Sequence, residues 1–179
     1  MNEMRYGGNI FLLPKGPEAA VVTTNGKRKS DGCAVMGAGI AKYARDNFKG
    51  IDKTLGQLLE RNGNHAYFLS SFQDVHRADK NLPPSVFVVT MPTKHDWRNP
   101  SDISLIARSA RELMAIATQN ALRKIYLPAP GCSNGKLDYV SQVRPIIAGI
   151  LDSRFTVCLD PALYDKLHPK NNLIPAGNK

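Results

Sequence analysis

The amino-acid sequence predicts an α/β fold of three layers, in which helices cover both faces of a central mixed, mostly parallel sheet. Short apolar runs rich in β-branched and aromatic residues alternate with longer segments of helical period, which is the pattern of such folds. Some short runs are apolar at consecutive positions, as at 86–89, and this suits strands buried on both faces. The length of 179 residues, with 42% hydrophobic and 22% charged residues, fits one globular domain. We expect that domain to span residues 1–168, followed by a polar tail rich in Pro, Gly and Asn at 169–179.

The apolar runs locate six expected strands, at residues 9–13, 19–24, 66–70, 86–91, 124–128 and 155–159. Helical segments are expected between them. One begins near Gly39, a second follows Gly50, and a third spans 103–117, where apolar residues recur every three or four positions. Ser101 is the expected N-cap of this third helix. A shorter helix is expected over about 140–151.

The charge balance favours an anionic partner. The chain has 24 Lys and Arg residues against 15 Asp and Glu, which gives a formal net charge of +9. Nucleic acids and phosphorylated small molecules are attracted by such an excess, although it also serves solubility alone. The densest basic block, at 27–29, is too short for a nucleic-acid-binding arm, so the charge does not name the ligand.

Several classes of protein are not expected. No apolar run approaches the roughly 18 residues that cross a bilayer, and the N-terminal residues lack the apolar stretch of a secretory signal. Cys33, Cys132 and Cys158 are odd in number and far apart, which fits neither a disulfide framework nor a zinc site. We therefore expect a cytoplasmic monomer that uses no metal or cofactor and contacts no membrane.

Two glycine-rich loops follow expected strands and precede expected helices, which is where α/β sheets bind ligands. In the first loop Gly37 and Gly39 open a helix, and the second, at 128–139, contains Gly131 and Gly135. Glycine lets the backbone approach a phosphate closely, and the N–H groups of a helix's first turn bind it. One such loop alone also fits a tight turn without a ligand. Two of them favour a diphosphate held between the loops.

A third loop, at 91–101, carries Lys94 just past the expected strand at 86–91. This places Lys94 at the same edge of the sheet as the glycine-rich loops. It is either a ligand contact or an exposed loop lysine, which is the usual environment of lysine. For Trp97 and Arg98 the plain structural alternative is that they only close this loop over the core.

At these residues the sequence resembles a macrodomain, the ADP-ribose-binding α/β/α module. It is most similar to the subclass that includes terminal ADP-ribose protein glycohydrolase and the DNA ADP-ribosyl glycohydrolase antitoxins. The motifs that carry the resemblance occur in the family's order: Gly8-Asn9-Ile10, Thr24-Asn25-Gly26, Val35-Met36-Gly37-Ala38-Gly39-Ile40-Ala41, Pro92-Thr93-Lys94 and Gly131-Cys132-Ser133-Asn134-Gly135-Lys136-Leu137-Asp138-Tyr139.

The resemblance implies a role for each motif. Asn9 would face the adenine, Asn25 would meet the hydroxyls of the distal ribose, and Lys94 would be the catalytic lysine. The loop at 35–40 would bind the pyrophosphate, and the loop at 131–135 would close over it from the other side. The implied set has Lys94 and Asn25 as catalytic residues and, as ligand-binding residues, Asn9, Ile10, Val35, Met36, Gly37, Ala38, Gly39, Ile40, Gly131, Cys132, Ser133, Asn134 and Gly135.

The sequence departs from the family pattern at several positions. The family usually has Asp where this chain has Asn9, whose amide oxygen can still accept a hydrogen bond from the adenine amino group. The aspartate that the protein glycohydrolase pairs with its lysine aligns with Gly135, and Asp138 is the candidate replacement. Residues 27–31 lengthen the first loop and could reach the ligand or the molecule attached to it.

Three functions follow as alternatives. The first is a hydrolase that removes ADP-ribose from DNA or protein, or the phosphate from ADP-ribose 1″-phosphate; the basic charge favours a nucleic-acid conjugate as substrate. The second is a non-catalytic ADP-ribose reader, which would not need the aspartate that Gly135 replaces. The third is a small basic nucleic-acid-binding protein with incidental glycine loops, for which the sequence offers no aromatic stacking platform.

Overall fold

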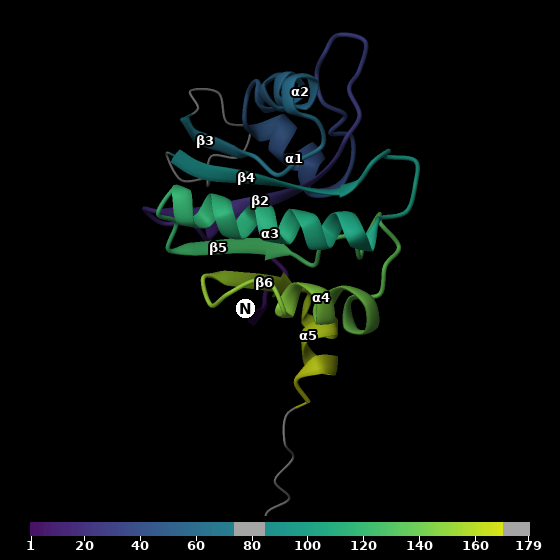
Figure 1. The fold of residues 1–179 in the computed structure, drawn as a ribbon. Helices are drawn as coiled ribbons and strands as arrows, with labels where there is room; N and C mark the ends of the chain where they lie inside the picture. The colour runs from purple at the N-terminus through teal and green to yellow at the C-terminus, as the bar shows by residue number, and fades with distance from the viewer. Residues whose placement is uncertain (74–84, 170–179) are drawn as a thin grey trace, which may run out of the picture.

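The computed structural model describes residues 1–73 and 85–169, which form a three-layer α/β/α fold (Figure 1). Its sheet has six strands in the order β1-β6-β5-β2-β4-β3, and only the β3–β4 pair is antiparallel. The predicted mixed, mostly parallel sheet is therefore confirmed. The strands are β1 (Asn2–Arg5), β2 (Glu18–Asn25), β3 (Phe68–Gln73), β4 (Ser85–Lys94), β5 (Lys124–Pro128) and β6 (Phe155–Leu159).

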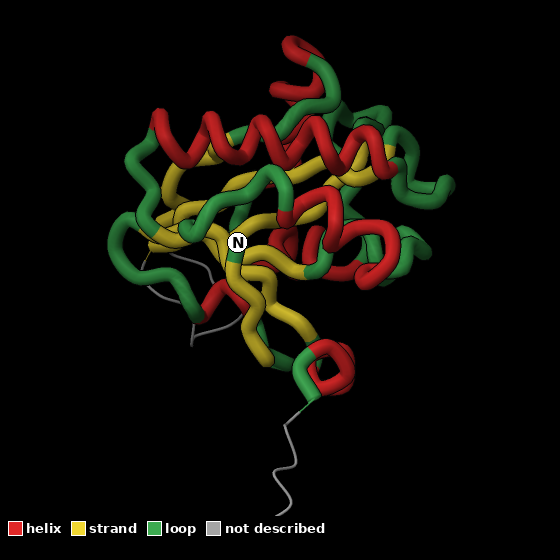
Figure 2. The backbone as a smooth tube through the Cα atoms, turned by 60° about the horizontal axis from the view of Figure 1, so that its bottom comes forward, coloured by secondary structure: helices red, strands yellow, loops and turns green. Residues whose placement is uncertain are grey.

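Helices cover both faces of this sheet, and Figure 2 shows the strands between them. The α-helices are α1 (Gly39–Asn47), α2 (Ile51–Asn62), α3 (Ile103–Gln119), α4 (Arg144–Ala148) and α5 (Pro161–Leu167). Successive side chains of β2 point to opposite faces. Ala20 and Val22 share a core with α1 and α2, whereas Ala19 and Val21 share a second core with α3 and α4. The alternation along this strand explains why it is apolar at consecutive positions.

The strands expected at 124–128 and 155–159 are confirmed to the residue, but the one at 9–13 is wrong. Ile10–Leu12 forms a 3₁₀ helix, because the side-chain oxygen of Asn9 accepts a hydrogen bond from the Phe11 N–H at 3.0 Å and turns the chain. An apolar run of this length does not distinguish the two structures. Strand β1 and helix α5 were not expected from the sequence.

The strand expected at 86–91 is longer in the structure and carries Lys94 as its last residue. Lys94 therefore lies within β4 rather than beyond it. It pairs with Asn25 of β2, after a register shift between Thr24 and Asn25. Such irregularities re-aim side chains next to binding sites.

Helix α3 begins at Ile103 as expected, but its N-cap is Asp102 rather than Ser101. The carboxylate of Asp102 accepts hydrogen bonds from the next turn's N–H groups, whereas Ser101 is buried against the second glycine-rich loop. The helix expected at 140–151 is split into a π-helix, Tyr139–Val143, and α4.

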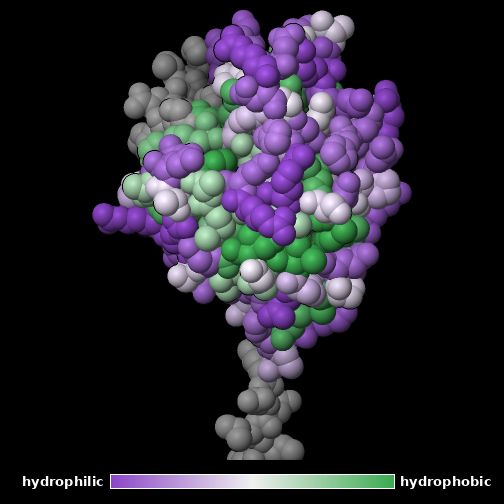
Figure 3. Space-filling model, in the orientation of Figure 1, coloured by the Kyte–Doolittle hydropathy of each residue, from purple (hydrophilic) through white to green (hydrophobic). Residues whose placement is uncertain are grey.

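Some expectations lie at the edge of what the structure describes. The polar tail expected at 169–179 falls, apart from Pro169, outside the described residues. Within 1–73 and 85–169, no helix has the length and apolar character needed to cross a membrane. In Figure 3, hydrophilic residues cover the upper part of the view around α2, and hydrophobic residues gather lower down, towards α4.

Candidate functional site

A cleft of about 550 Å³ lies where the loops leave the carboxyl ends of β2, β4 and β5. These loops gather at the right-hand side of Figure 1. Residues of all three loops singled out in the sequence line the cleft: Thr23, Thr24, Asn25, Val35, Gly37, Ala38, Gly39, Ile40, Ala41, Thr93, Lys94, Trp97, Ser101, Pro128, Ala129, Gly131, Ser133, Asn134 and Gly135. The two glycine-rich loops therefore share one cavity although about a hundred residues separate them.

The first loop presents bare backbone to this cleft. Helix α1 begins at Gly39, which has a φ of +54°, a conformation that favours glycine. Its N-cap, Ala38, offers no side-chain acceptor, and the first-turn N–H groups of a helix have no intrahelical partner. A Cβ atom added at Gly37 would meet nothing within 4 Å. The start of α1 is thus open to a ligand.

The second loop is held by tight packing against the start of α3. A Cβ atom at Gly135 would lie 2.1 Å from the Ser101 hydroxyl oxygen and 2.2 Å from the Gly131 carbonyl oxygen. The Gly135 carbonyl accepts a hydrogen bond from the Ser101 N–H at 2.9 Å. Position 135 consequently has no room for the aspartate with which it aligns in the resembling family.

The two loops approach each other directly. A Cβ atom at Gly39 would lie 3.3 Å from the side-chain nitrogen of Asn134. Both residues line the cleft, so the Gly39 main chain and the Asn134 amide lie close together in its wall. The two loops thus meet in one cleft, as their positions at the carboxyl ends of neighbouring strands predicted.

Lys94 connects the end of β4 to the second loop. Its Nζ donates a hydrogen bond to the Asn134 carbonyl at 2.7 Å, and the Trp97 carbonyl lies at 3.5 Å. Among the described residues that line the cleft, Lys94 is the only one with an ionisable side chain, and none is acidic. The cleft is therefore suited to an anionic ligand.

Asn25, at the end of β2, fixes the shape of the first loop. Its amide nitrogen donates to the Val35 carbonyl at 2.9 Å, and its amide oxygen accepts from the Lys27 N–H at 3.0 Å. Asn25 therefore has a clear structural function beside any contact with a ligand.

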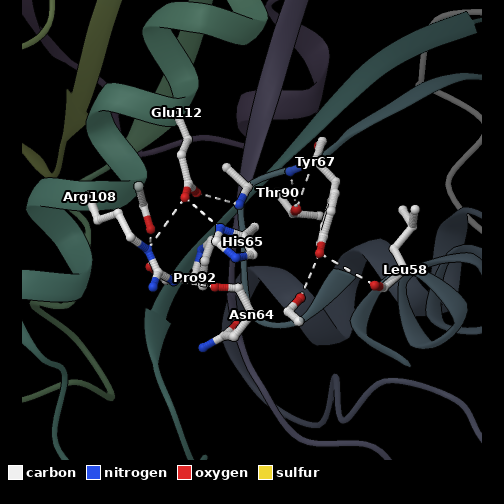
Figure 4. A network of polar contacts seen from close by, with 11 residues as sticks. Leu58, Asn64, His65, Tyr67, Thr90, Pro92, Arg108 and Glu112 are labelled. Atoms are coloured by element: carbon white, nitrogen blue, oxygen red, sulfur yellow. Dashed lines mark hydrogen bonds and ion pairs between the residues drawn. The ribbon is translucent and has the colours of Figure 1, made fainter. Parts of the chain in front are cut away.

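A polar network that includes Asn64, Arg108 and Glu112, none of which lines the cleft, contacts the end of β4 (Figure 4). Asn64 donates from its side chain to the main-chain oxygen of Lys94 at 3.0 Å, and its own carbonyl accepts from Arg108. The Glu112 carboxylate lies between Arg108 and His65, 3.4 Å and 2.7 Å from their nitrogen atoms. Sequence reasoning did not single out Asn64, because nothing local marks a contact with a residue 30 positions away.

The basic insertion at 27–31 is paired with acidic residues of the protein itself. Lys27 lies 3.6 Å from Asp96, and Arg28 lies 3.0 Å from Glu60. The first of these pairs joins the first loop to the loop after β4. The insertion thus contacts the loop after β4 and helix α2. Lys27 and Arg28 are paired within the protein and are not fully available to a ligand.

A second cavity of about 380 Å³ adjoins the first and shares Gly39, Ile40 and Pro128 with it. Its other lining residues include three aromatic side chains and the predicted ligand-binding residues Asn9 and Ile10. In full they are Tyr6, Gly7, Gly8, Asn9, Ile10, Phe11, Tyr43, Cys158 and Asp160. The Asn9 amide donates to the Tyr43 hydroxyl and accepts from the Phe11 N–H. Asn9 is thus held in place by the protein before any ligand binds.

Two predicted ligand-binding residues do not line either cavity with the others. Met36 is buried in the core beneath α1 and α2, and Cys132 packs beside the core beneath α3. Burial, and then the nearby Asp138, raises the pKa of the Cys132 thiol to about 12, so it remains protonated and unreactive at neutral pH. Met36 and Cys132 can therefore contact a ligand only through their main-chain atoms.

Asp138 does not replace the missing aspartate. Its carboxylate accepts hydrogen bonds from the N–H and the hydroxyl of Ser141, at 2.7 Å and 2.6 Å, and it does not line the cleft. Those hydrogen bonds lower its pKa and tie it to the start of the π-helix. All three cysteines are free, and within the described residues no three His, Cys, Asp or Glu side chains are grouped to hold a metal ion.

No protein-family model and no curated protein sequence matches this chain. Among solved structures it is similar to Thermosipho africanus DarTG in complex with ADP-ribose, with a TM-score of 0.68 and 19% identity over 88% of this chain and 41% of that one. It is also similar to the macrodomain of Mycobacterium tuberculosis DarG, with a TM-score of 0.63 and 20% identity, covering 88% of this chain and 96% of that one. For the macrodomain of Thermus aquaticus DarG the TM-score is 0.60 and the identity 23%, over 89% and 96%. The chain therefore has the macrodomain fold, and it spans less than half of the DarTG chain.

Proposed function

We propose that this protein binds ADP-ribose along the two adjoining cavities. The smaller cavity, with Asn9 and Tyr43, receives the adenine. The diphosphate lies between the two glycine-rich loops, where the cavities meet at Gly39. The distal ribose lies in the larger cleft, beside Asn25 and Lys94.

The observation that carries this proposal is the composition of the larger cleft. Its described lining has one cation, Lys94, no carboxylate, and main chain of two glycine-rich loops. Helix N-termini and closely approaching backbone bind phosphate through N–H groups, and a lysine adds a positive charge. The likeness in fold to DarTG, which was solved in complex with ADP-ribose, supports the same ligand.

We propose further that the protein is a hydrolase acting at the anomeric carbon of the distal ribose. The Lys94 ammonium first loses a proton to solvent; the resulting amine then attacks that carbon, and the bond from the carbon to the attached group breaks. The electron pair stays with the leaving atom, which takes the proton that Lys94 gives up on attack. Water then adds to the anomeric carbon, releasing ADP-ribose and restoring the Lys94 amine.

The macromolecule that carries the ADP-ribose is DNA or protein, and the net charge of +9 favours DNA. ADP-ribose 1″-phosphate, from which only phosphate would be removed, is the small-molecule alternative.

A non-catalytic reader is the second candidate function, and one specific observation favours it. No carboxylate lines the described cleft, and the packing around Gly135 excludes the aspartate that would complete a lysine–aspartate dyad. A reader needs only the loops and the adenine cavity. The two functions differ in turnover and not in binding.

The test combines a substrate panel with two lysine variants. ADP-ribosylated DNA, ADP-ribosylated protein and ADP-ribose 1″-phosphate are incubated with wild type, Lys94→Ala and Lys53→Ala, and release of ADP-ribose is followed by chromatography. Lys53 is an exposed lysine of α2 and lines neither cavity, so it is the matched control. We expect at least one conjugate to be cleaved, with turnover lost in Lys94→Ala and kept in Lys53→Ala.

Binding of ADP-ribose without cleavage of any conjugate would establish the reader. Unchanged turnover in Lys94→Ala would remove the lysine from the mechanism.

A further inference from the structure

The end of β4 extends past its neighbour β3 and is held there by side chains from other elements. Within the described residues, the register of β3 on β4 runs no further than Val89. Past that point the Pro92 carbonyl accepts a hydrogen bond from the Ser109 hydroxyl at 2.8 Å. The Lys94 carbonyl accepts one from the Asn64 amide at 3.0 Å. Since β2 pairs with this end of β4 on one side only, the two side-chain hydrogen bonds fix its other side.

The side chain of Asn64 costs the fold some stability. Its amide oxygen is buried and has no hydrogen-bond partner among the described residues. A buried oxygen without a partner costs more free energy than one neutral hydrogen bond contributes. The amide also packs tightly at the start of the first loop, where a Cβ atom at Gly26 would lie 2.8 Å from the Asn64 Cγ. Stability therefore does not account for an amide at this position, whereas a contact that places Lys94 does.

Asn64 is itself placed by two charged side chains of α3. Its main-chain oxygen accepts a hydrogen bond from Arg108, which lies one helical turn before Glu112. In the part of the chain that the structure describes, the Nε atom of Arg108 is buried without a hydrogen-bond acceptor, and the Glu112 carboxylate lies 3.4 Å away. A buried cation needs such a neighbouring charge. Figure 4 shows the carboxylate between Arg108 and His65.

Glu112 also holds the segment between α2 and β3 that carries Asn64. One of its carboxylate oxygens accepts a hydrogen bond from the Ala66 N–H at 2.8 Å, and the other lies 2.7 Å from the Nδ1 atom of His65. Asn64 is bound through Arg108. One side chain of α3 therefore fixes three consecutive residues of this segment, and through them the amide that contacts the end of β4.

We propose that Asn64, Arg108 and Glu112 are positioning residues for Lys94, and that they set the rate of the chemical step rather than the affinity for the ligand. This inference rests on the proposed hydrolase function, because it takes the Lys94 amine as the nucleophile. None of the three residues is among the described residues that line the two cavities. Their contacts run from Glu112 through Arg108 and Asn64 to the main chain of Lys94, whose Nζ donates to the Asn134 carbonyl at 2.7 Å.

The first test separates rate from affinity. Because displacing a reacting group by about 1 Å can cost about 100-fold in rate, Glu112→Ala should lower kcat on the cleaved conjugate about 5- to 100-fold. The Kd for ADP-ribose should change less than about threefold. Glu112→Gln keeps an oxygen for the Ala66 N–H but no charge for Arg108, so its kcat should lie in between. The control Asp165→Asn removes an exposed ion pair between α5 and β1 and should change neither quantity. An unchanged kcat in Glu112→Ala, or equal fold-changes in kcat and Kd, would overturn the proposal.

The second test asks whether Glu112 acts through Asn64. If it does, adding Glu112→Ala to Asn64→Ala should lower kcat by less than about twofold more, although each change alone costs several-fold. Effects that multiply would show that Glu112 acts by another route, and would overturn the proposal. Urea denaturation of the same proteins sets the assay temperature at which all of them are folded, so that loss of the fold is not counted as loss of rate.

The third test needs no turnover. In an HNCO spectrum the carbonyl carbon of Lys94 is observed through the amide of His95, and its chemical shift responds to the hydrogen bond from Asn64. We expect this shift to change in Asn64→Ala and in Glu112→Ala, and to stay in Asp165→Asn. An unchanged shift in Glu112→Ala would overturn the proposal.

Failure of the inference and failure of the proposed function give different results. If wild type cleaves no conjugate, the proposed hydrolase is wrong, and the carbonyl shift alone decides whether the three residues position Lys94. If a conjugate is cleaved but kcat does not respond to Glu112→Ala, the inference alone is wrong.

Discussion

A side chain introduced at Gly37 should block the diphosphate without harming the fold. A Cβ atom there would meet no atom within 4 Å, and the residue's φ lies outside the left-handed region. Gly37 also lines the cleft at the start of α1. Replacement by Ala, Val and Leu therefore adds increasing bulk inside the cleft while leaving the core untouched.

The expected loss of affinity follows from the hydrogen bonds that the phosphate would lose. Each hydrogen bond from an N–H group to a charged oxygen contributes roughly 1.5–3 kcal/mol. Displacement from two first-turn N–H groups costs about 3–6 kcal/mol, and one decade of affinity corresponds to about 1.4 kcal/mol. Gly37→Val should therefore weaken ADP-ribose binding by about 150-fold or more, with Gly37→Ala between it and wild type. The free energy of unfolding should stay within about 1 kcal/mol of wild type or rise slightly, because glycine has the larger unfolded-state entropy.

Calorimetric titration with ADP-ribose measures the affinity, and urea denaturation measures the stability. Gly149→Val is the matched control: Gly149 is exposed at the end of α4, its φ is −78°, and its nearest contacts are ordinary at 3.7 Å. It lines neither cavity, so this variant should bind as wild type does. Wild-type affinity in a folded Gly37→Leu variant would refute the assignment of this loop to the diphosphate.

Three further predictions concern stability and positioning. Gly135→Ala places a methyl carbon 2.1 Å from a neighbouring hydroxyl oxygen, so urea denaturation should detect a loss of about 2–3 kcal/mol, and an unchanged midpoint would contradict this packing. Asn64→Ala removes the hydrogen bond to the main-chain oxygen of Lys94, and it should lower kcat on the cleaved conjugate several-fold more than it changes the Kd for ADP-ribose; equal changes would argue against a positioning role. Burial alone would raise the pKa of Glu3, but hydrogen bonds, first among them that from Arg144, outweigh it and lower the pKa. The ionised carboxylate therefore stabilises the fold above its unfolded pKa of about 4.3, and this contribution disappears as the pH falls through the lower folded value. Denaturation of wild type and Glu3→Gln should differ by about 2 kcal/mol at pH 7 and converge only once the pH has fallen through the lowered folded pKa of Glu3; a difference independent of pH would contradict the assignment.

The central strands of the sheet could be predicted from the sequence, because burial on both faces requires consecutive apolar residues there. Strands β2, β5 and β6 are buried on both faces, and their apolar runs mark them without help from distant residues. Strand β1 is short and half exposed, and it is held by its pairing with β6. Nothing in its four residues distinguishes it from a loop.

A side-chain hydrogen bond that replaces strand pairing accounts for the 3₁₀ helix at 10–12. The Asn9 amide captures a main-chain N–H and turns a segment whose apolar residues alone indicate a strand. Pairing accounts for the extra length of β4, because Asn25 of β2 extends the ladder as far as Lys94.

Sequence motifs predicted the glycine positions of the candidate site. They did not predict which side chains of its loops are exposed. Gly37, Gly39, Gly131 and Gly135 were found from the motifs, and all of them line one cleft. The exposure of Trp97 depends on how its loop packs against Lys27 and Lys94, which no local pattern encodes.

The most direct measurement is a calorimetric titration of the wild-type chain with ADP-ribose. Binding of a diphosphate between the two loops predicts one saturable site with a micromolar Kd, about −8 kcal/mol, and a Kd about 150-fold higher or more in Gly37→Val. A folded wild-type protein that gives no saturable heat up to millimolar ADP-ribose would contradict it.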